Sequence, residues 1–354
     1  MTSASQFQHI RQSGNNSPMK ILFLLKSETT PSTRIRFLDL RTHLAEAGIE
    51  PVMEMIPSSF WRKRVLFRTA AEYDAVVLQK RLLSLFDFCE LRRYARRLVF
   101  DFDDAIYHKN ASCSADPADY GSSTRMGKFR RTVRGADMVI AANRILADKT
   151  ALVNPKVPVT IIPSSVDCSS FKVKTDYNLQ APPVVGWIGT KSTLRYLELV
   201  APAFAELRSK RDFILRIMSN EKYVQPGINV DFVPWSLEAQ NTGLCRFDIG
   251  IMPLSRDPFS EGKSAYKLLQ YLAAGVPSVC SPVGMNADVS GNDEYCLTAS
   301  DNSQFCHQME RLLDSCELRR SLGRKGRSLI EEKYSIKAVA GRLSSALKSV
   351  VENK

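Results

Sequence analysis

The pattern of apolar and polar positions changes from strand-like to helix-like and back within residues 248–286, and the rest of the chain is organised around this stretch. Residues 249–252 form an apolar run that predicts a buried strand. From Lys263, apolar side chains recur at helical spacing until Gly275, a common helix stop. Residues 276–280 predict the next strand. This order is typical of a right-handed crossover in a parallel sheet, where ligands bind at the carboxyl edge.

Polar residues gather where this helix is expected to start. Lys263 opens the helix beside Ser264, and Lys267 follows one turn later. Free backbone amides, the positive end of the helix dipole and two ammonium groups would meet there, which suits a phosphate or diphosphate. The alternative is a surface helix with solvated lysines. A lysine in the first turn opposes the dipole unless an anion compensates it, and this favours the anion site.

Buried strands alternate with helical segments along most of the chain. Strands are expected at residues 19–25, 50–55, 75–78, 99–101, 138–141, 159–162, 184–189, 213–218 and 230–233, besides the two above. This alternation predicts two doubly wound, Rossmann-like α/β domains that face a cleft. The expected division is a tail at 1–17, an N-terminal domain at 18–166, a linker at 167–183, a C-terminal domain at 184–333 and a terminal helix at 334–354 that packs back on the first domain.

Composition narrows the class of protein. With 354 residues and 44% apolar residues, the chain can form two cores, and no apolar run approaches the ~20 residues of a membrane span. Residues 1–17 are polar, lack the apolar segment of a signal peptide, and are expected to be disordered. The eight cysteines form no CxxC pair and have no histidine at metal-ligand spacing. We therefore expect reduced thiols in a cytoplasmic protein.

Acidic residues follow one expected strand of the first domain. Asp101, Asp103 and Asp104 stand where α/β enzymes commonly mount catalytic side chains. Neighbouring carboxylates can bind a divalent metal or sugar hydroxyls, or act as acid and base, and the alternative is loop solvation and helix capping. No second ligand cluster supports a metal, so we expect no metal and no cofactor.

Two further loops could bind phosphate. Arg34 and Arg36 begin an expected helix at 32–47, where arginines can grip a phosphate with two hydrogen bonds, although a solvated surface pair fits equally well. In the second domain, Gly189 and Thr190 precede Lys191 and a serine, and a glycine lets the backbone approach an anion. The spacing there matches neither the P-loop nor the dinucleotide fingerprint.

With these residues in view, the second half resembles the nucleotide-sugar-binding domain of GT-B glycosyltransferases, in the family-4 group of retaining enzymes. The resemblance rests on KLLQYLAAGVPSV at 267–279, DIGIMPL at 248–254 and SPVG at 281–284. It extends to VGWIG at 185–189, RIR at 34–36, FDFDDA at 100–105, ANRILA at 142–147 and IPSSVD at 162–167. It thus covers nearly the whole chain after residue 19, and the helix-and-loop motif is its most specific part.

The resemblance implies roles for residues near this helix. The family's glutamate that binds the donor ribose corresponds to Gln270, an amide that can still donate and accept. The second glutamate, which touches the donor sugar, falls on Gly262, so the neighbouring Glu261 is only a candidate. Backbone amides around Gly284 and Met285 would hold the diphosphate or sugar, as that loop does in relatives.

The resemblance also leaves gaps in the donor site. The family's arginine after the first strand of this domain is missing, and Lys191 is expected to replace it in part, with Lys263 and Lys267 supplying positive charge. Trp235 is expected to stack on the base or to lie in the core.

The implied reaction transfers a glycosyl group from a nucleoside-diphosphate sugar to an acceptor hydroxyl, with retention and without an obligatory metal. Asp103 or Asp104 would lie near the donor sugar, and His108 is expected to be a loop residue. Two alternatives are a catalytically silent sugar-nucleotide-binding subunit, which Gln270 and the missing arginine keep open, and a GT-B sugar-nucleotide epimerase.

The charge distribution bears on partners. Of the net +12, residues 1–180 carry +9 (27 basic, 18 acidic), and the rest carry +3 (22 basic, 19 acidic). Phe60, Trp61 and Phe67 interleave with basic residues, as in helices that lie on anionic membranes. The first domain is therefore expected either to dock on a membrane and meet a lipid-linked or cell-envelope saccharide acceptor, or to have solvated helix faces with these aromatics in its core. No nucleic-acid recognition module is present.

Overall fold

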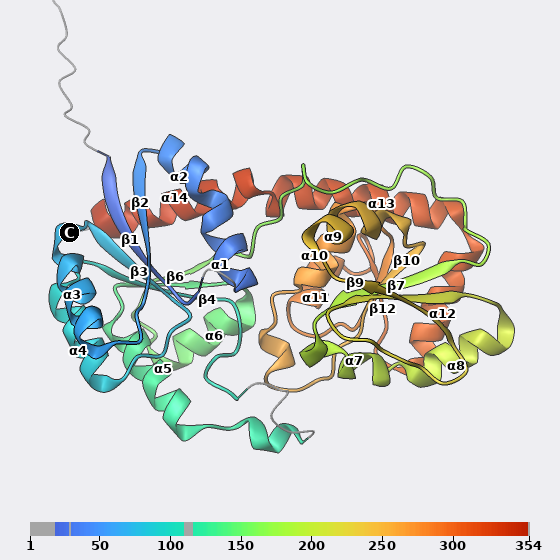
Figure 1. Cartoon of the computed structure of the whole chain (residues 1–354), viewed down its shortest axis with the longest axis horizontal. Helices are drawn as coiled ribbons and strands as arrows, with labels where there is room; N and C mark the ends of the chain where they lie inside the picture. Colours follow the sequence, from blue (N-terminus) through green and yellow to red (C-terminus); the bar gives the residue numbers. More distant parts are fainter. Residues whose placement is uncertain (1–17, 28–29, 110–115, 353–354) are drawn as a thin grey trace, which may run out of the picture.

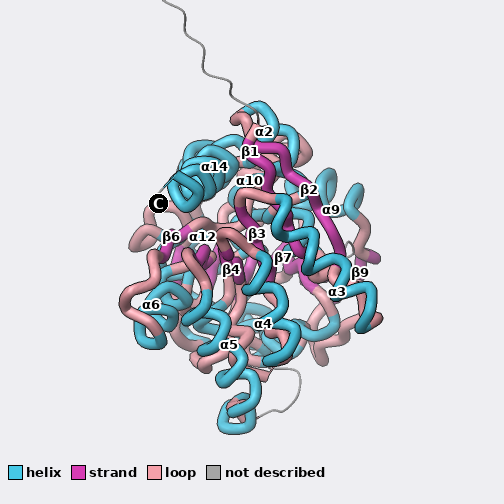
Figure 2. Tube along the Cα trace, turned by 90° about the vertical axis from the view of Figure 1, so that its left-hand side faces the viewer, coloured by secondary structure: helices cyan, strands magenta, loops and turns pink. Residues whose placement is uncertain are grey.

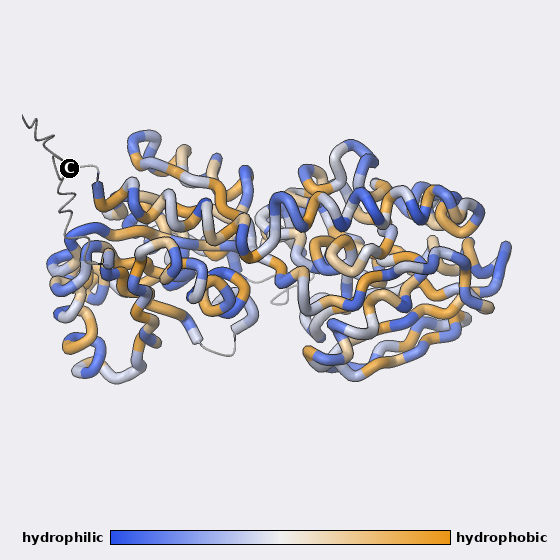
Figure 3. The backbone as a smooth tube through the Cα atoms, turned by 90° about the horizontal axis from the view of Figure 1, so that it is seen from above, coloured by the Kyte–Doolittle hydropathy of each residue, from blue (hydrophilic) through white to orange (hydrophobic). Residues whose placement is uncertain are grey.

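The computed structural model describes residues 18–27, 30–109 and 116–352, and shows two α/β domains side by side (Figure 1). The expected tail at 1–17 lies outside the described residues. Each domain has a six-stranded sheet in which all paired strands are parallel. Two doubly wound α/β domains were predicted from the sequence, and this prediction is confirmed. Apolar stretches run through both domains in the view from above (Figure 3).

The first sheet has the order β2-β1-β3-β4-β5-β6, so the chain changes direction across the sheet between β1 and β3. Its strands are β1 (Met19–Leu25), β2 (Ile49–Met55), β3 (Ala75–Gln79), β4 (Leu98–Phe102), β5 (Met138–Ala141) and β6 (Val159–Ile161). Its helices are α1 (Pro31–Arg36), α2 (Arg41–Glu46), α3 (Phe60–Thr69), α4 (Leu85–Tyr94), α5 (Ser123–Gly135) and α6 (Arg144–Val153). The helix expected at 32–47 is broken, because Phe37 leaves helical geometry at φ −138° and ψ −51°.

The second sheet has the order β12-β11-β10-β7-β8-β9, with the change of direction between β7 and β10. Its strands are β7 (Val184–Gly189), β8 (Ile214–Ser219), β9 (Asn229–Pro234), β10 (Ile249–Met252), β11 (Ser278–Cys280) and β12 (Leu297–Thr298). The helices are α7 (Arg195–Glu198), α8 (Ala201–Lys210), α9 (Leu237–Gly243), α10 (Tyr266–Ala273), α11 (Met285–Ser290), α12 (Asn302–Asp314), α13 (Cys316–Leu329) and α14 (Ile336–Glu352). The sequence did not reveal β12, which is too short to show an alternating pattern.

Single helical turns complete the described elements. They are η1 (Leu38–Leu40), η2 (Ala70–Glu72), η4 (Pro117–Tyr120), η5 (Lys191–Thr193), η6 (Leu244–Arg246), η7 (Ser260–Gly262) and the wide turn η8 (Ile330–Tyr334). No helix within the described ranges is both long and apolar enough to cross a bilayer.

The last helix returns to the first domain. The Ser335 hydroxyl caps α14 by accepting from the Ala338 amide at 3.3 Å. Beyond the cap, α14 lies along α2 and β1 (Figures 1 and 2). Its apolar face shares one core with the first sheet, formed by Ile21, Phe23, Val77, Val339, Ala340, Leu343 and Leu347 among others. The predicted packing of the terminal helix on the first domain is therefore confirmed.

The stretch at 167–183 runs along the second domain. The Lys172 amide donates to the Asn241 carbonyl at 2.8 Å, and the Tyr177 hydroxyl donates to the Gly275 carbonyl at 3.0 Å. Phe171 is buried in the same core as the residues of α10. The segment that leads from one domain to the other is thus attached to the second domain over much of its length.

Candidate active site

The carboxyl edges of the two sheets meet at the segment before α10. The Asn143 side-chain amide, just after β5, donates to the carbonyl oxygens of Gly262 and Lys263, both at 3.2 Å. The Ser264 hydroxyl donates to the Asp103 carbonyl at 2.5 Å. Gly262 packs against Ala105 of the first domain. Ligands of open α/β sheets bind at such carboxyl edges, so this junction is the candidate active site.

Helix α10 begins at Tyr266, not at Lys263 as predicted. Lys263 is extended (φ −71°, ψ 147°), and Ala265 adopts a left-handed conformation with φ +51°. The hydrogen bonds from the first domain hold the segment before the helix out of helical geometry. Consequently the Ser264 hydroxyl binds the first domain instead of a ligand, and Lys263 lies ahead of the helix.

Lys263 and Lys267 form a half-buried pair of ammonium groups. The Lys267 Nζ lies 4.7 Å from the centroid of a Trp187 ring, and the Lys263 Nζ lies 4.7 Å from the ring centroid of Phe259. Neither lysine forms an ion pair with a carboxylate of the described residues. Burial lowers the pKa of Lys267 well below its ordinary value, and the charge of Lys263 lowers it further. Burial also lowers the pKa of Lys263. A nearby anion would reverse both shifts.

Helix α10 is anchored at the point where the strand order of the second sheet reverses. The Tyr271 hydroxyl accepts from the Ile188 amide of β7 at 3.0 Å and donates to the Ile251 carbonyl of β10 at 3.2 Å. Ligand-binding crevices in open sheets occur at such points. A Cβ atom at Gly189, at the end of β7, would lie 2.7 Å from the Lys267 Cε atom. The absence of a side chain at Gly189 thus makes room for Lys267.

The loop before α11 packs against the η7 turn. Gly284 has φ +55°, and a Cβ atom there would clash with the Glu261 carbonyl oxygen. Met285 opens α11 directly after it, and the Glu261 side chain is exposed. Gln270 is almost fully buried on α10, one turn beyond Lys267. The structure therefore brings Glu261 of the η7 turn against Gly284, at the start of α11.

The acidic residues of the first domain are paired with basic side chains. The Arg36 guanidinium donates to the Asp101 carboxylate, with Nε 2.9 Å from Oδ2, and to the Ile162 carbonyl at 3.1 Å. Both side chains are buried. The hypothesis that Arg36 grips a phosphate is therefore wrong, because its donors already hold the end of β4 in place. Arg34 lies 3.7 Å from the Asp39 carboxylate.

Sequence reasoning missed Lys80, which follows β3 with a left-handed backbone (φ +49°). Its ammonium group lies 2.8 Å from the Asp103 carboxylate and 2.7 Å from that of Asp104. Burial tends to lower the pKa of Lys80, but the two carboxylates outweigh it and raise the pKa. Burial likewise tends to raise the pKa of Asp103, and Lys80 outweighs it, so this pKa is lowered. The signal in the sequence that could have revealed Lys80 is a basic residue directly after the end of a strand.

No group of three or more metal-ligating side chains occurs among the residues that the structure describes. Instead, the carboxylates after β4 have basic partners. His108 is half-buried beside the Tyr107 ring, and burial together with Lys149 lowers its pKa. It is thus placed as a loop residue near the junction.

Comparison with known proteins identifies the second domain. Residues 182–315 match the family described as glycosyl transferases group 1. The second domain is therefore similar to this family over most of its length. The resemblance predicted from the sequence is therefore confirmed. No curated protein matches the chain at the level of sequence.

Solved structures similar to this chain have the same two-domain GT-B fold. Sucrose-phosphate synthase from Thermosynechococcus elongatus has a TM-score of 0.72 at 16% identity, over 95% of this chain and 100% of that one. HepE from Anabaena, in complex with UDP and glucose, has a TM-score of 0.70 at 14% identity, over 94% and 100%. A glycosyltransferase from Rickettsia africae has a TM-score of 0.67 at 11% identity, over 95% and 99%.

Three predicted donor residues follow strands of the second sheet: Thr190 and Lys191 follow the central strand β7, and Trp235 follows β9. Lys191 points to solvent and pairs with Glu221 at 3.2 Å, while the Thr190 hydroxyl is 3.0 Å from the Ser192 hydroxyl. Trp235 follows the edge strand β9 and is 47% exposed, so the alternative that it lies in the core is wrong. Its side chain is free to stack on a planar group.

A further hydrogen bond joins the two domains. The Arg195 guanidinium of α7 donates to the Tyr120 hydroxyl at 2.6 Å.

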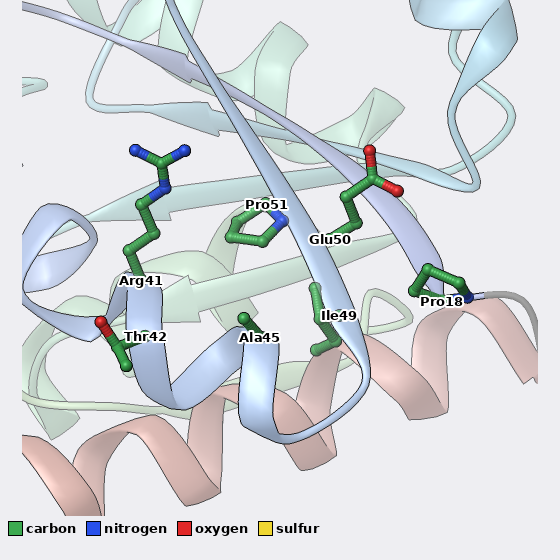
Figure 4. Close-up of a pocket in the computed structure, with 7 residues that line it drawn as sticks. All are labelled: Pro18, Arg41, Thr42, Ala45, Ile49, Glu50 and Pro51. Atoms are coloured by element: carbon green, nitrogen blue, oxygen red, sulfur yellow. The ribbon is translucent and has the colours of Figure 1, made fainter.

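Away from the junction, a hollow of about 650 Å³ opens beside β2 and α2 (Figure 4). It is lined by Pro18, Arg41, Thr42, Ala45, Ile49, Glu50 and Pro51. Pro18 and Ile49 mark the amino ends of β1 and β2, so the hollow lies at the edge opposite the candidate site.

Proposed function

We propose that this glycosyltransferase moves a sugar from a nucleoside-diphosphate sugar to an acceptor hydroxyl with retention of configuration. The observation that carries the proposal is the pair Lys263 and Lys267, two half-buried ammonium groups without a carboxylate partner among the described residues. They lie where the strand order reverses. An uncompensated positive pair in this position is suited to a diphosphate.

The donor would lie across the carboxyl edge of the second sheet. Lys263 and Lys267 would neutralise the charge that develops on the diphosphate when the glycosidic bond breaks. Fixed charges do so without reorganisation, and they supply the positive charge that other enzymes take from a metal. The amides of Gly284 and Met285 would hold the diphosphate or sugar, and Gln270 would bind the ribose. Trp235 would stack on the base, supported by its exposure.

The first domain would supply groups near the reacting sugar. Asp103 and Asp104 are held at the junction by Lys80, and Glu261 approaches from the second domain. Because the salt bridge keeps Asp103 ionised, this carboxylate would bind sugar hydroxyls or stabilise positive charge on the sugar instead of donating a proton.

We propose a saccharide or lipid-linked saccharide of the cell envelope as the acceptor. Two structural neighbours support the substrate classes. HepE has been solved with UDP-glucose. TarM from S. aureus has been solved with UDP and saccharides, and it matches over 81% of this chain and 59% of that one, at 12% identity and a TM-score of 0.58. A catalytically silent binding subunit is the second candidate. Gly262 favours it, because this glycine stands where the resemblance expects a glutamate and has no room for a side chain.

The test is a screen of UDP-, GDP- and TDP-sugars with the purified full-length protein. We expect one donor class to bind and to be slowly hydrolysed, with release of the nucleoside diphosphate. NMR of the transferred sugar, once an acceptor is found, should show the anomeric configuration of the donor. Binding without any turnover would favour the silent subunit. Absence of binding to every donor would overturn the proposal.

A further inference from the structure

Exposed apolar side chains gather on two neighbouring helices of the first domain. Of the thirteen large apolar residues that are exposed in the described structure, five lie on α3 and α4: Phe60, Trp61, Val65, Leu85 and Phe86. Trp61 is 77% exposed. The two helices pack side by side (Figure 2), so these five residues form one surface, here called the α3–α4 face. Contiguous apolar surface of this kind marks an interaction site.

Ring stacking and ion pairs between α3 and α4 hold the α3–α4 face rigid. The Phe60 and Phe86 rings are stacked, with centroids 5.9 Å apart and planes inclined by 10°. The Arg64 guanidinium lies 3.6 Å from the Phe86 ring centroid and pairs with Glu90 at 2.8 Å. Lys63 joins α3 to α4 through Asp87 at 2.9 Å. Phe67, the third aromatic residue of this region, is fully buried in the core. The aromatic rings are thus ordered in a solvent-facing position.

The surroundings of the face are basic. Residues 60–97 contain ten basic and four acidic residues, and α5 adds five basic residues and no acidic one. Exposed arginines of these helices and of the turn after α4 include Arg62, Arg68, Arg93, Arg96, Arg125, Arg130 and Arg134. Aromatic residues set among arginines match the interface of an anionic bilayer.

The face also adjoins the candidate active site. Leu85 and Phe86 begin α4, and a short loop joins them to Lys80, which binds Asp103 and Asp104. In parallel α/β units a helix starts at the carboxyl edge of the strand before it. The aromatic ends of α3 and α4 therefore lie at the same edge of the first sheet as the candidate active site.

We propose that the α3–α4 face docks this protein on an anionic membrane, with Phe60, Trp61, Leu85 and Phe86 in the headgroup region and the arginines against lipid phosphates. The orientation would present the cleft to an acceptor whose saccharide is attached to a lipid. That last step rests on the proposed function, whereas docking is measured without donor or acceptor. A second copy of the chain is disfavoured as the occupant, because a symmetric contact would bring two basic surfaces together.

The test is flotation of the full-length protein with vesicles of phosphatidylcholine, with or without about 30 mol% phosphatidylglycerol. We expect flotation only with the anionic vesicles, and its loss at roughly 0.5 M salt. The double variant Trp61→Ser/Phe86→Ser should lower the partition coefficient at least tenfold. The triple variant Arg62→Gln/Arg68→Gln/Arg93→Gln should lower it by a similar factor. These side chains face solvent, so the variants are expected to fold, which circular dichroism would verify.

Leu152→Ser is the matched control, because Leu152 of α6 is 82% exposed but lies outside the face. It should float like the wild type. Brominated acyl chains should quench the fluorescence of the wild type more than that of Trp61→Phe. Absence of flotation on anionic vesicles at low salt would overturn the proposal. The proposal would also be overturned if the protein forms a dimer that the double variant Trp61→Ser/Phe86→Ser dissociates, while flotation of this variant stays unchanged. Normal donor hydrolysis without flotation would reject membrane docking and leave the proposed function intact. Flotation without donor binding would reject the proposed function and leave membrane docking intact.

Discussion

Gly262 lies so close to Ala105 of the other domain that a Cβ atom at position 262 would be 2.7 Å from the Ala105 Cβ atom. It would also be 2.9 Å from the Ala105 backbone nitrogen, which cannot yield as a flexible side chain can. The residue type that the resemblance expects here, glutamate, is therefore incompatible with the observed domain contact. The glycine that lets the two domains meet at this point is thus also the residue that stands in place of the glutamate.

Gly262→Ala should separate the domains or strain their contact. Overpacking of this kind costs roughly 1–3 kcal/mol, so we expect a larger radius of gyration by small-angle X-ray scattering and a lower kcat/KM. Gly127→Ala is the control, because a Cβ atom at Gly127 meets nothing within 4 Å. Unchanged scattering and activity in Gly262→Ala would show that the contact is dispensable.

Lys267→Ala should weaken donor binding far more than Lys191→Ala. A lost interaction with a charged group costs about 1.5–3 kcal/mol, or roughly 10–100-fold in Kd, whereas exposed ion pairs such as Lys191–Glu221 contribute little. Isothermal titration calorimetry with the donor identified in the screen measures both. If both variants bind like the wild type, the assignment of the diphosphate site is wrong.

Donor affinity should depend on pH through Lys267. Its pKa is lowered in the free protein, and a bound diphosphate would raise it, so binding should take up a proton. Affinity should then fall as pH rises through the lowered pKa of the free protein, earlier than for an ordinary lysine. Calorimetry in two buffers of different ionisation enthalpy reports the proton uptake. Lys267→Arg should reduce this dependence to the part that Lys263 contributes, because arginine stays protonated. Equal enthalpies in both buffers from about pH 7 to about pH 10 would contradict the prediction.

Arg36→Ala should lower stability. It leaves the Asp101 carboxylate buried without its partner, which costs about 3–5 kcal/mol of the free energy of unfolding. Urea denaturation measures the loss, and Arg34→Ala, at a partly exposed position, should change it by less than about 0.5 kcal/mol. The double variant Arg36→Met/Asp101→Leu should recover most of the stability, since no charge remains buried. A stable Arg36→Ala would return Arg36 to the list of possible phosphate ligands.

The sequence predicted the strands better than the start of α10. Buried strands leave a local apolar signal, and Lys267 became a candidate because it is the charged residue of a mostly apolar helix. The start of the helix depends on Asn143 and Asp103, which hold Gly262, Lys263 and Ser264 from the other domain. Such contacts leave no local pattern.

The ion pairs could not be assigned from the sequence for a related reason. Arg36, Lys80 and the acidic residues after β4 are far apart along the chain, and parallel strands bring their ends to one edge. Arg36 was therefore assigned to a phosphate when its partner was Asp101. Lys80 was passed over, although its pairing with Asp103 and Asp104 is what fixes their position.

The return of α14 to the first sheet has a consequence for biosynthesis. Val339, Ala340, Leu343 and Leu347 complete the apolar layer beneath β1 and β3, yet they follow the whole second domain in the chain and leave the ribosome after it. N-terminal domains generally fold first during synthesis. Here that domain must wait, with part of its interior open to water, until the second domain and α14 have been synthesised.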